Sequence, residues 1–388
     1  MDPRAVPYIP STSPAILLSP PESVSHSPTI AEVDLGALRR NLATIRRRVA
    51  PRPVMAVVKA NAYGHGAERV AQCLLAEGVQ HFAVATLDEG IALRQAGISG
   101  NILVFGAPLP AELPWFAENE LDLTVGSESI LMAVLQCDTP LRVQLLVDTG
   151  MTRLGLEPQR AISALAMLGG AGHVALTGVC THLAGADLPD RARTTAQLAT
   201  WSDFLASARP VGCPVHVAAS GGCWTSPEAL KHSDLVRAGI SLYGLYEPSG
   251  DTAPDVLEPV ARLISRVARV QRIGAGTAVS YGGRWKAPYE TRVATIAAGY
   301  ADGVPRSLSN VGRVGIRGRL FPMVGTICMD MLMVHIDDPD FPMSEGDEVV
   351  LFGRGGPSCS EQAEKALSIT YEMVCRISGR VARRYRPE

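Results

Sequence analysis

The stretch Val54-Met55-Ala56-Val57-Val58-Lys59 is a short apolar run that ends in a lysine, and seven similar runs follow it along the chain. They cover residues 82–86, 102–105, 121–125, 143–148, 176–182, 215–220 and 235–243, with helix-length segments between them. Continuous apolar strands that alternate with helices indicate a parallel sheet covered on both faces. Eight such units over about 200 residues predict a closed (β/α)₈ barrel, with an open doubly wound sheet as the alternative.

The segments before and after the barrel differ from it in composition. Residues 1–28 contain seven prolines and six serines. They cannot bury enough apolar surface to offset their ordering entropy, so we expect a disordered tail. Polar and apolar residues alternate over 262–272, and short glycine-punctuated runs follow at 294–298, 314–316, 331–336 and 348–352. This pattern is typical of a mostly antiparallel β domain.

Two helices are expected outside the barrel repeats. Leu38, Leu42 and Ile45 recur at helical spacing, and a second helix should begin near Ser360. The fold class is therefore predicted to be α/β, with a TIM barrel followed by a mostly-β domain. We expect the tail over residues 1–28, the ligand-binding barrel over 29–255 and the C-terminal β domain over 256–388.

Composition excludes several classes of function. The formal net charge is −2 and the pI is about 6.5, which gives no electrostatic case for nucleic acid or an anionic membrane as partner. The apolar stretch 15–18 is too short for a signal-peptide core, so we expect a cytoplasmic protein. Eight cysteines without a C-x-x-C pair favour reduced thiols over disulfides or a zinc site, and no metal site is expected.

Polar residues interrupt the apolar runs at the end where barrel enzymes place their chemistry. Lys59 ends the first run, Arg153 follows the fifth, His182 ends the sixth, Ser220 ends the seventh and Arg237 lies in the eighth. Most lysines are solvated surface groups. Because Lys59 closes an apolar strand, partial desolvation should lower its pKa and make it an imine-forming nucleophile.

Glycine-rich segments near these residues suggest where a ligand binds. Ser220-Gly221-Gly222 and Ala238-Gly239-Ile240 follow the last two runs, the usual place for a phosphate in a barrel. Gly64 and Gly66 follow Lys59 closely, and we expect them to allow close approach of the backbone to the ligand.

Six sequence blocks then resemble, in order, the motifs of the alanine racemase family. The first, Val57-Val58-Lys59-Ala60-Asn61-Ala62-Tyr63-Gly64-His65-Gly66, resembles the family's pyridoxal-lysine motif. The others are Asp148-Thr149-Gly150-Met151-Thr152-Arg153-Leu154-Gly155, Arg237-Ala238-Gly239-Ile240, Ser280-Tyr281-Gly282, Gly299-Tyr300-Ala301-Asp302-Gly303 and Cys328-Met329-Asp330. The blocks lie between residues 57 and 330, the resemblance covers roughly residues 30 to 385, and the ordered set is highly specific.

The resemblance implies an isomerase that interconverts L- and D-alanine with pyridoxal 5'-phosphate, working as a homodimer whose active sites form between subunits. By that resemblance Lys59 forms the internal aldimine and serves one face of the substrate Cα, while Tyr281 of the second subunit serves the other. Inversion requires such a pair, because one proton leaves from one side and another returns from the opposite side. Read without the resemblance, Tyr281 is a turn aromatic beside glycines.

The resemblance also assigns the cofactor contacts. Arg237 would face the pyridine nitrogen and, because arginine stays protonated, keep that nitrogen unprotonated. Arg153 would bind the phenolic oxygen and lie near the substrate carboxylate, and His182 would pack near the ring. Phosphate contacts map onto Tyr63, Ser220, Gly239, Ile240 and Tyr371, and the partner's Met329 would meet the substrate carboxylate through its backbone. The simpler alternatives are an Arg237–Asp234 ion pair and core packing for Met329.

Three departures from the family pattern stand out. Leu146 replaces a lysine that many members carry as a carbamate, so another group or a bound anion has to support Arg153. Ala219 replaces an asparagine near the cofactor. Thr326 replaces an arginine of the substrate entrance, which could alter selectivity. Arg306, Asp187 and Ile369 match other entrance positions.

Three other functions remain open. A racemase of broader specificity, acting on serine or other amino acids, is the nearest. A barrel-type pyridoxal decarboxylase would be expected to place a carboxylate near the pyridine nitrogen, where this chain offers Arg237. A non-catalytic protein that carries pyridoxal phosphate would lack the β domain.

Overall fold

The computed structural model describes residues 26–386 except 209, 211 and 247–256. The predicted tail lies outside the described residues up to residue 25, as does the predicted domain boundary near 255. None of the described helices is long and apolar enough to span a membrane. All eight cysteines are free.

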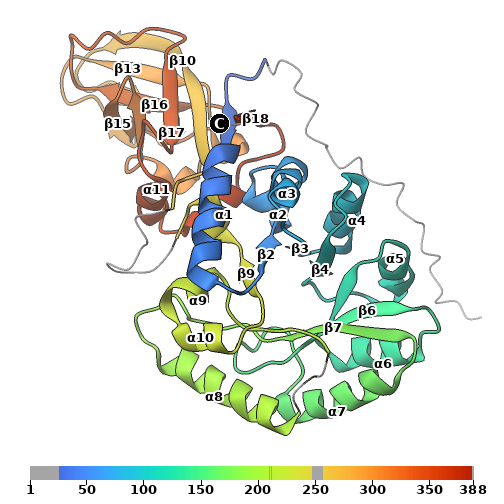
Figure 1. The fold of residues 1–388 in the computed structure, drawn as a ribbon. Coiled ribbons are helices and arrows are strands. Elements are labelled where there is room, and N and C mark those ends of the chain that lie inside the picture. Colours follow the sequence, from blue (N-terminus) through green and yellow to red (C-terminus); the bar gives the residue numbers. More distant parts are fainter. Residues whose placement is uncertain (1–25, 209, 211, 247–256, 387–388) are drawn as a thin grey trace, which may run out of the picture.

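The N-terminal domain is a barrel of eight parallel strands, as predicted (Figure 1). The strands follow one another in the order β8-β7-β6-β5-β4-β3-β2-β9. A parallel bridge between Ala219 and Arg237 joins the two ends of this order and closes the barrel, so the open sheet is excluded. The strands are β2 (Val54–Val57), β3 (His81–Val84), β4 (Asn101–Val104), β5 (Asp122–Val125), β6 (Leu141–Leu146), β7 (Val174–Cys180), β8 (Val215–His216) and β9 (Val236–Ala238).

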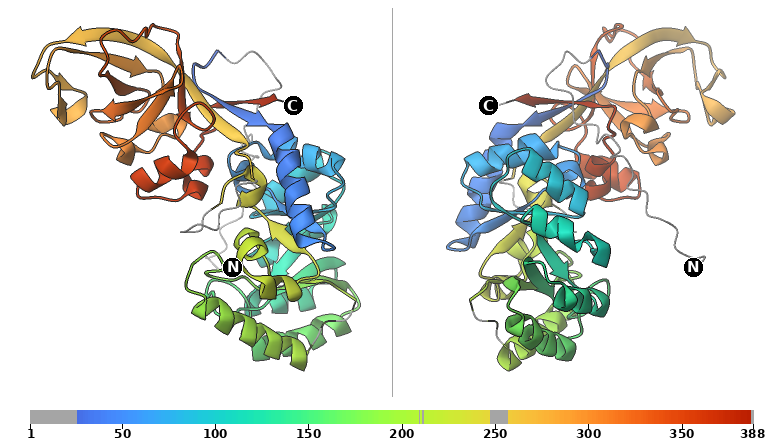
Figure 2. Two further views of the ribbon diagram at one scale, coloured as in Figure 1. Left: turned by 60° about the vertical axis from the view of Figure 1, so that its left-hand side comes forward. Right: turned by 90° about the vertical axis from the view of Figure 1, so that its right-hand side faces the viewer.

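Helices follow the strands and cover the outside of the barrel (Figure 2). The predicted helix through Leu38, Leu42 and Ile45 is α1 (Leu35–Val49), which buries these three side chains. Thr86 and Glu89 form a capping box at the N-terminus of α4, which defines the residue at which the helix after β3 begins. The other barrel helices are α2 (Lys59–Tyr63), α3 (Ala67–Ala76), α4 (Leu87–Gln95), α5 (Leu113–Glu118), α6 (Glu128–Gln136), α7 (Pro158–Gly170), α8 (Ala192–Ser207), α9 (Ser220–Thr225) and α10 (Pro227–Lys231).

The C-terminal domain is a mostly antiparallel sheet that projects from one end of the barrel (Figures 1 and 2). Its strand order is β13-β16-β15-β14-β17-β10-β1-β18, and β11 (Ala278–Val279) pairs with β12 (Trp285–Lys286) separately. Two helices, α11 (Cys359–Lys365) and α12 (Thr370–Cys375), follow β17, and α11 confirms the helix predicted near Ser360. The remaining strands are β10 (Ala261–Ile273), β13 (Thr291–Ile296), β14 (Arg313–Ile316), β15 (Arg319–Val324), β16 (Leu332–Ile336), β17 (Glu348–Phe352) and β18 (Ala382–Arg386).

The first strand that the structure describes, β1 (Ile30–Asp34), belongs to the sheet of the C-terminal domain. Its predicted place was in the barrel, over residues 29–255. It pairs antiparallel with β10 and parallel with β18. Glu32 explains the position, because its buried carboxylate accepts hydrogen bonds from Arg262 at 2.5 Å and Arg386 at 2.7 Å. Burial alone would raise the pKa of Glu32, but the two guanidinium groups lower it below its ordinary value.

Candidate active site

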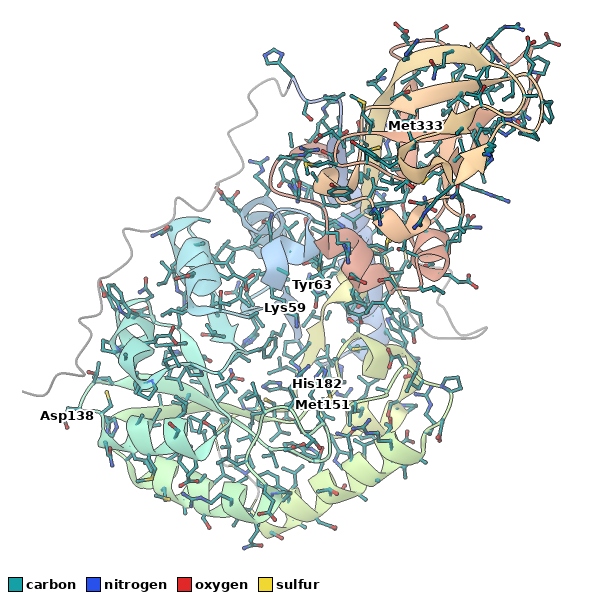
Figure 3. All side chains as sticks on the ribbon, turned by 180° about the vertical axis from the view of Figure 1, so that it is seen from behind. Lys59, Tyr63, Asp138, Met151, His182 and Met333 are labelled. Atoms are coloured by element: carbon teal, nitrogen blue, oxygen red, sulfur yellow. The ribbon has the colours of Figure 1, made fainter. Side chains whose placement is uncertain are left out.

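A cavity of about 520 Å³ lies at the carboxyl ends of the barrel strands. Figure 3 shows Lys59, Tyr63, Met151 and His182 close together in the barrel, whereas Met333 lies in the β domain. The cavity brings together nine of the eleven residues that the sequence analysis assigned to the site: Lys59, Tyr63, Arg153, His182, Ser220, Arg237, Gly239, Ile240 and Tyr371.

Lys59 follows strand β2 and reaches the cavity through an apolar wall. Val57 and Val58 before it are buried. Burial lowers the pKa of Lys59, and the positive charge of Arg153 lowers it further. Within the part of the chain that the structure describes, the Lys59 amine makes no hydrogen bond. The amine is therefore positioned and electrostatically biased to act as a nucleophile.

The residues after Lys59 form a turn of left-handed helix. Ala60, Asn61 and Ala62 have φ of 52, 54 and 53°, and Tyr63 has φ of 52°. Such a conformation costs roughly 1–2 kcal/mol per residue other than glycine. Glu89 helps to hold it, because its carboxylate accepts hydrogen bonds from the Ala60 N–H at 2.6 Å on one oxygen and from the Ala85 N–H at 2.7 Å on the other.

Gly64 and Gly66 serve a different purpose from the one expected. A Cβ on Gly64, whose φ is +81°, would lie 2.1 Å from the Val374 carbonyl oxygen on α12. A Cβ on Gly66, whose φ is +97°, would lie 1.8 Å from the Tyr385 hydroxyl on β18. These glycines therefore admit the C-terminal elements of the chain itself, not the ligand. Through this contact the β domain supports the lysine turn.

Arg237 lies fully inside the barrel mouth, with 4% of its surface exposed. Its guanidinium donates to the carbonyl oxygens of Thr181 at 2.8 Å, His216 at 2.8 Å and Val217 at 3.0 Å. The alternative partner, Asp234, instead accepts a hydrogen bond from the Val215 N–H. Arg237 thus keeps a buried positive charge that is directed at the cavity.

Two histidines beside Arg237 are neutral. His182 and His216 each present Nδ1 to the guanidinium, at 3.3 and 2.6 Å. Because arginine can only donate, both Nδ1 atoms accept, which places the histidine protons on Nε2. Burial, followed by the charge of Arg237, lowers the pKa of His182 to about 3 and that of His216 well below its ordinary value.

His216 begins a chain of hydrogen bonds through the barrel interior. Its Nε2–H donates to Gln144 Oε1 at 2.9 Å, and Gln144 Nε2 donates to Asp122 at 2.9 Å. The Asp122 carboxylate also accepts from Thr177 at 2.7 Å and Arg142 at 2.6 Å. Arg237 at one end of this chain can only donate and the Asp122 carboxylate at the other end can only accept, so the donor and the acceptor of every hydrogen bond between them are determined.

The loop that carries Arg153 is organised by one aspartate. Asp148 Oδ1 accepts hydrogen bonds from the backbone N–H groups of Gly150 at 2.8 Å, Met151 at 2.9 Å and Thr152 at 3.1 Å. Gly155 is required there, since its φ is +123° and a Cβ would lie 2.6 Å from the Asp148 nitrogen. Arg153 is exposed to the cavity as a result.

The wall of the cavity formed by Ser220, Gly239 and Tyr63 fits a phosphate group. Ser220 Oγ accepts hydrogen bonds from the Gly239 N–H at 2.9 Å and the Ser241 hydroxyl at 3.0 Å, which leaves its own proton free to donate. A Cβ on Gly239 would lie 2.7 Å from the Tyr63 hydroxyl, so only glycine leaves this space open. Arg153 and Arg237 add positive charge around it. The donors and charges suit an anionic ligand that also carries a group reactive toward an amine.

The two remaining predicted residues lie in the β domain and do not line this cavity. Tyr281 begins a short 3₁₀ turn, and its side chain is 73% exposed. Met329 is 54% exposed, so core packing does not explain it. Both side chains are therefore available to a second molecule.

The three positions that depart from the family pattern lie in different surroundings. Leu146 and Ala219 line the cavity, together with the matching entrance residue Asp187. Thr326 is buried, with 2% of its surface exposed, and donates a hydrogen bond to the Tyr281 carbonyl oxygen at 2.8 Å. Ile369 is half exposed at the start of α12.

Sequence reasoning missed the residues that support the site from behind. Glu89, Gln144, Asp122 and His216 lie outside every quoted motif. The capping pattern Thr86-x-x-Glu89 was a readable signal for a helix start, although not for its contact with Ala60. The polar residues inside apolar strands, Asp122 and Gln144, were the signal for a buried network.

Comparison with known protein families supports the motif resemblance. The family model described as alanine racemase, N-terminal domain, matches residues 33–247. The model described as alanine racemase, C-terminal domain, matches residues 260–385.

Individual proteins are similar over almost the whole chain. The alanine racemase of Chlorobaculum tepidum is 42% identical over 374 residues, which cover 92% of this chain and 96% of that protein. The alanine racemase of Symbiobacterium thermophilum is 42% identical over 369 residues, 92% of this chain and 97% of its own.

Solved structures have the same architecture. The alanine racemase of Clostridium difficile 630 superposes with a TM-score of 0.86 at 35% identity, covering 94% of this chain and 97% of its own. The Bacillus anthracis enzyme with bound L-Ala-P gives 0.87 at 32% identity, with coverages of 94% and 97%. The Bartonella henselae enzyme with covalently bound pyridoxal phosphate gives 0.84 at 32% identity, with coverages of 92% and 99%.

Proposed function

Because this chain belongs to the alanine racemase family, and is thus a pyridoxal-phosphate-dependent isomerase that interconverts L- and D-alanine, we propose that Lys59 and Tyr281 are its two proton-transfer groups. The observation that carries the proposal is the position of Lys59. Its amine has a lowered pKa and lies in the same cavity as the phosphate-fitting wall and Arg237.

The cofactor, when bound, holds the amino acid and withdraws electrons from its Cα. Ser220, Gly239, Ile240, Tyr63 and Tyr371 would hold its phosphate.

The protein's own groups would tune this chemistry. Arg237 would donate a hydrogen bond to the pyridine nitrogen, and its permanent charge would prevent that nitrogen from taking a proton. This limits electron withdrawal and favours simple return of a proton over other reactions of the substrate. Arg153 would orient the phenolic oxygen and the substrate carboxylate, and neutral His182 would pack against the ring.

Inversion needs a proton acceptor on one face of the substrate Cα and a donor on the other. Lys59 would serve the face toward the barrel wall. Tyr281 is exposed on the β domain of the same chain and does not line the cavity, so the opposite face would be served by Tyr281 of the partner subunit. A homodimer with shared active sites follows, in which the backbone of the partner's Met329 meets the substrate carboxylate.

The alternative functions are less well supported. The match to the C-terminal domain model disfavours a cofactor-carrying barrel without a β domain. Arg237 gives the pyridine nitrogen a cationic neighbour, which disfavours a decarboxylase that needs a carboxylate there. We place the enzyme in the cytoplasm, where it would supply D-alanine for biosynthesis.

Borohydride reduction tests the central assignment. The purified, cofactor-supplied protein should carry a pyridoxyl group on Lys59 by peptide mass spectrometry, and Lys59→Ala should carry none. An adduct on another lysine would overturn the assignment. Chiral chromatography of a panel of L-amino acids, incubated with the same preparation, should show D-alanine as the fastest product, and a faster D-serine signal would favour the broader specificity.

A further inference from the structure

The loop that carries Tyr281 starts with a strained residue. Ser280 has φ of 65° and ψ of −176°, a backbone conformation that is essentially restricted to glycine. A residue other than glycine stays there only when surrounding contacts hold it. The structure therefore has to contain a restraint next to Tyr281.

A crossed pair of hydrogen bonds supplies that restraint. The Ser280 hydroxyl donates to the Thr326 carbonyl oxygen at 2.5 Å, and the Thr326 hydroxyl donates to the Tyr281 carbonyl oxygen at 2.8 Å. Thr326 is 2% exposed, so water competes little for these groups. Each of two adjacent residues is thus bonded to the same threonine.

The loop around Thr326 is itself anchored. The Gly325 N–H donates to Asn310 Oδ1 at 2.7 Å, and the Ile327 N–H donates to Ser309 Oγ at 3.0 Å. A Cβ on Gly325, whose φ is +76°, would lie 2.7 Å from the Val279 carbonyl oxygen. The two loops are therefore in close backbone contact, and Thr326 is a fixed point.

Tyr281 itself has little other support. Its side chain is 73% exposed, so packing within its own chain cannot define where the phenol lies. The position of the phenol then depends on the backbone of residues 280 and 281. The arginine expected at position 326 from the family resemblance has no hydroxyl, so the second bond of the pair depends on the threonine of this chain.

We propose that Thr326, together with Ser280, is a positioning residue that aims the Tyr281 phenol at the substrate bound by the partner subunit. The inference rests on the proposed role of Tyr281. In this proposal Thr326 affects proton transfer through the position of Tyr281, and it does not act on the substrate entrance.

Deuterium isotope effects measure this role directly. Each enantiomer loses its α-proton to one of the two groups, so misplacing Tyr281 slows only the transfers on its face. In Thr326→Val holoenzyme, kcat should fall by about 10- to 100-fold. The isotope effect on kcat/KM with α-deuterated alanine should rise for the enantiomer whose proton faces Tyr281 and fall for the other. Thr326→Ser, which keeps the hydroxyl, should leave both isotope effects close to those of the wild type.

A second pair of variants separates aiming from folding. Ser280→Gly accepts the same backbone angles but loses its bond to Thr326, so it should fold normally and still show the opposite changes in the two isotope effects. Hydrogen exchange of the peptide containing Tyr281 should be faster in Thr326→Val and Ser280→Gly than in Thr326→Ser, independently of turnover. The thermal midpoint and cofactor content check that each variant is intact.

The possible results are distinguishable. If Tyr281→Phe racemises alanine normally, the proposed function is wrong at Tyr281. If Tyr281→Phe is inactive while Thr326→Val keeps wild-type isotope effects, only the positioning role is overturned. The same holds if Thr326→Val loses activity and the isotope effects for the two enantiomers change in the same direction.

Discussion

Arg237 and His216 are joined by a 2.6 Å hydrogen bond in which the guanidinium donates to Nδ1. The bond requires a neutral imidazole, because a protonated His216 would place a second donor against the arginine. Gln144 and Asp122 maintain the neutral form from the other side of the ring, since Gln144 turns its amide oxygen toward Nε2–H. Residues in the barrel interior thus keep His216 neutral beside the ligand cavity.

Gln144→Glu should disturb this arrangement in a pH-dependent way. A carboxylate next to Nε2 raises the pKa of His216 and allows it to take a proton as pH falls, which repels Arg237. Cofactor affinity, measured by absorbance titration, should fall about tenfold at pH 6 and less at pH 8. Gln144→Met removes the same hydrogen bonds without adding charge, so its loss of affinity should be the same at both pH values. Equal losses at the two pH values in both variants would contradict the mechanism.

His65 should make the protein less stable in mild acid. It is fully buried, Nδ1 contacts two carbonyl oxygens, and Nε2 has no partner among the described residues. Burial lowers the pKa of His65 to about 4. The unfolded chain therefore binds a proton that the folded chain excludes, and stability is lost as pH falls from about 6.5 toward 4, by about 1.4 kcal/mol per pH unit. Urea unfolding of the wild type and His65→Gln should show this slope in the difference between them, and a flat difference would refute it.

Gly239→Ala should weaken cofactor binding without unfolding the protein. The added methyl group would lie 2.7 Å from the Tyr63 hydroxyl in the phosphate-fitting wall, and Tyr63 is buried and cannot move freely. Overpacking of this kind costs about 1–3 kcal/mol, which corresponds to a roughly 5- to 150-fold higher dissociation constant for pyridoxal phosphate. Gly169→Ala is the matched control, because nothing lies within 4 Å of its added Cβ. Unchanged affinity in Gly239→Ala would place the phosphate elsewhere.

Gly64→Ala should destabilise the contact between the two domains. The alanine would have φ of +81° and its Cβ would lie 2.1 Å from the Val374 carbonyl oxygen, so either the lysine turn or α12 has to move. We expect a loss on the order of 3 kcal/mol in chemical denaturation. Ala60→Gly is the opposite control: it relieves a left-handed residue and should leave stability equal or higher.

Mixed dimers test the shared active site. Lys59→Ala and Tyr281→Phe are each expected to be inactive, the second by about 10²–10⁴-fold with cofactor still bound. When the two chains are unfolded and refolded together, a mixed dimer regains one site with both groups intact, so roughly a quarter of the wild-type activity should return. Absence of any recovery, with mixed dimers present by native mass spectrometry, would show that Lys59 and Tyr281 of the same chain work together.

The sequence predicted the barrel and its rim because both have a local signature. Eight apolar runs at regular spacing identified the strands, and residues such as Lys59 and Arg237 interrupted those runs at one end. The position of β1 could not be predicted, because its pairing with β18 joins residues about 350 positions apart and leaves no local pattern.

Long-range contacts limited the prediction of the site in the same way. Gly64 and Gly66 looked like ligand-facing glycines until the structure placed α12 and β18 against them. Tyr281 came from the family resemblance alone, since nothing in its local sequence separates it from a turn residue. In the sequence, Thr326 was notable only because it replaces an arginine of the family pattern. The structure shows that its hydroxyl donates a hydrogen bond to Tyr281.

The placement of β1 between β10 and β18 also has a consequence for the order of events on the ribosome. β1 leaves the ribosome about 350 residues before its parallel neighbour β18. The barrel and the pairing of β1 with β10 can form while synthesis continues, but the edge of β1 that faces β18 stays unpaired until residues 382–386 have left the ribosome. The second sheet is therefore completed late, when β18 reaches a strand that was translated about 350 residues earlier.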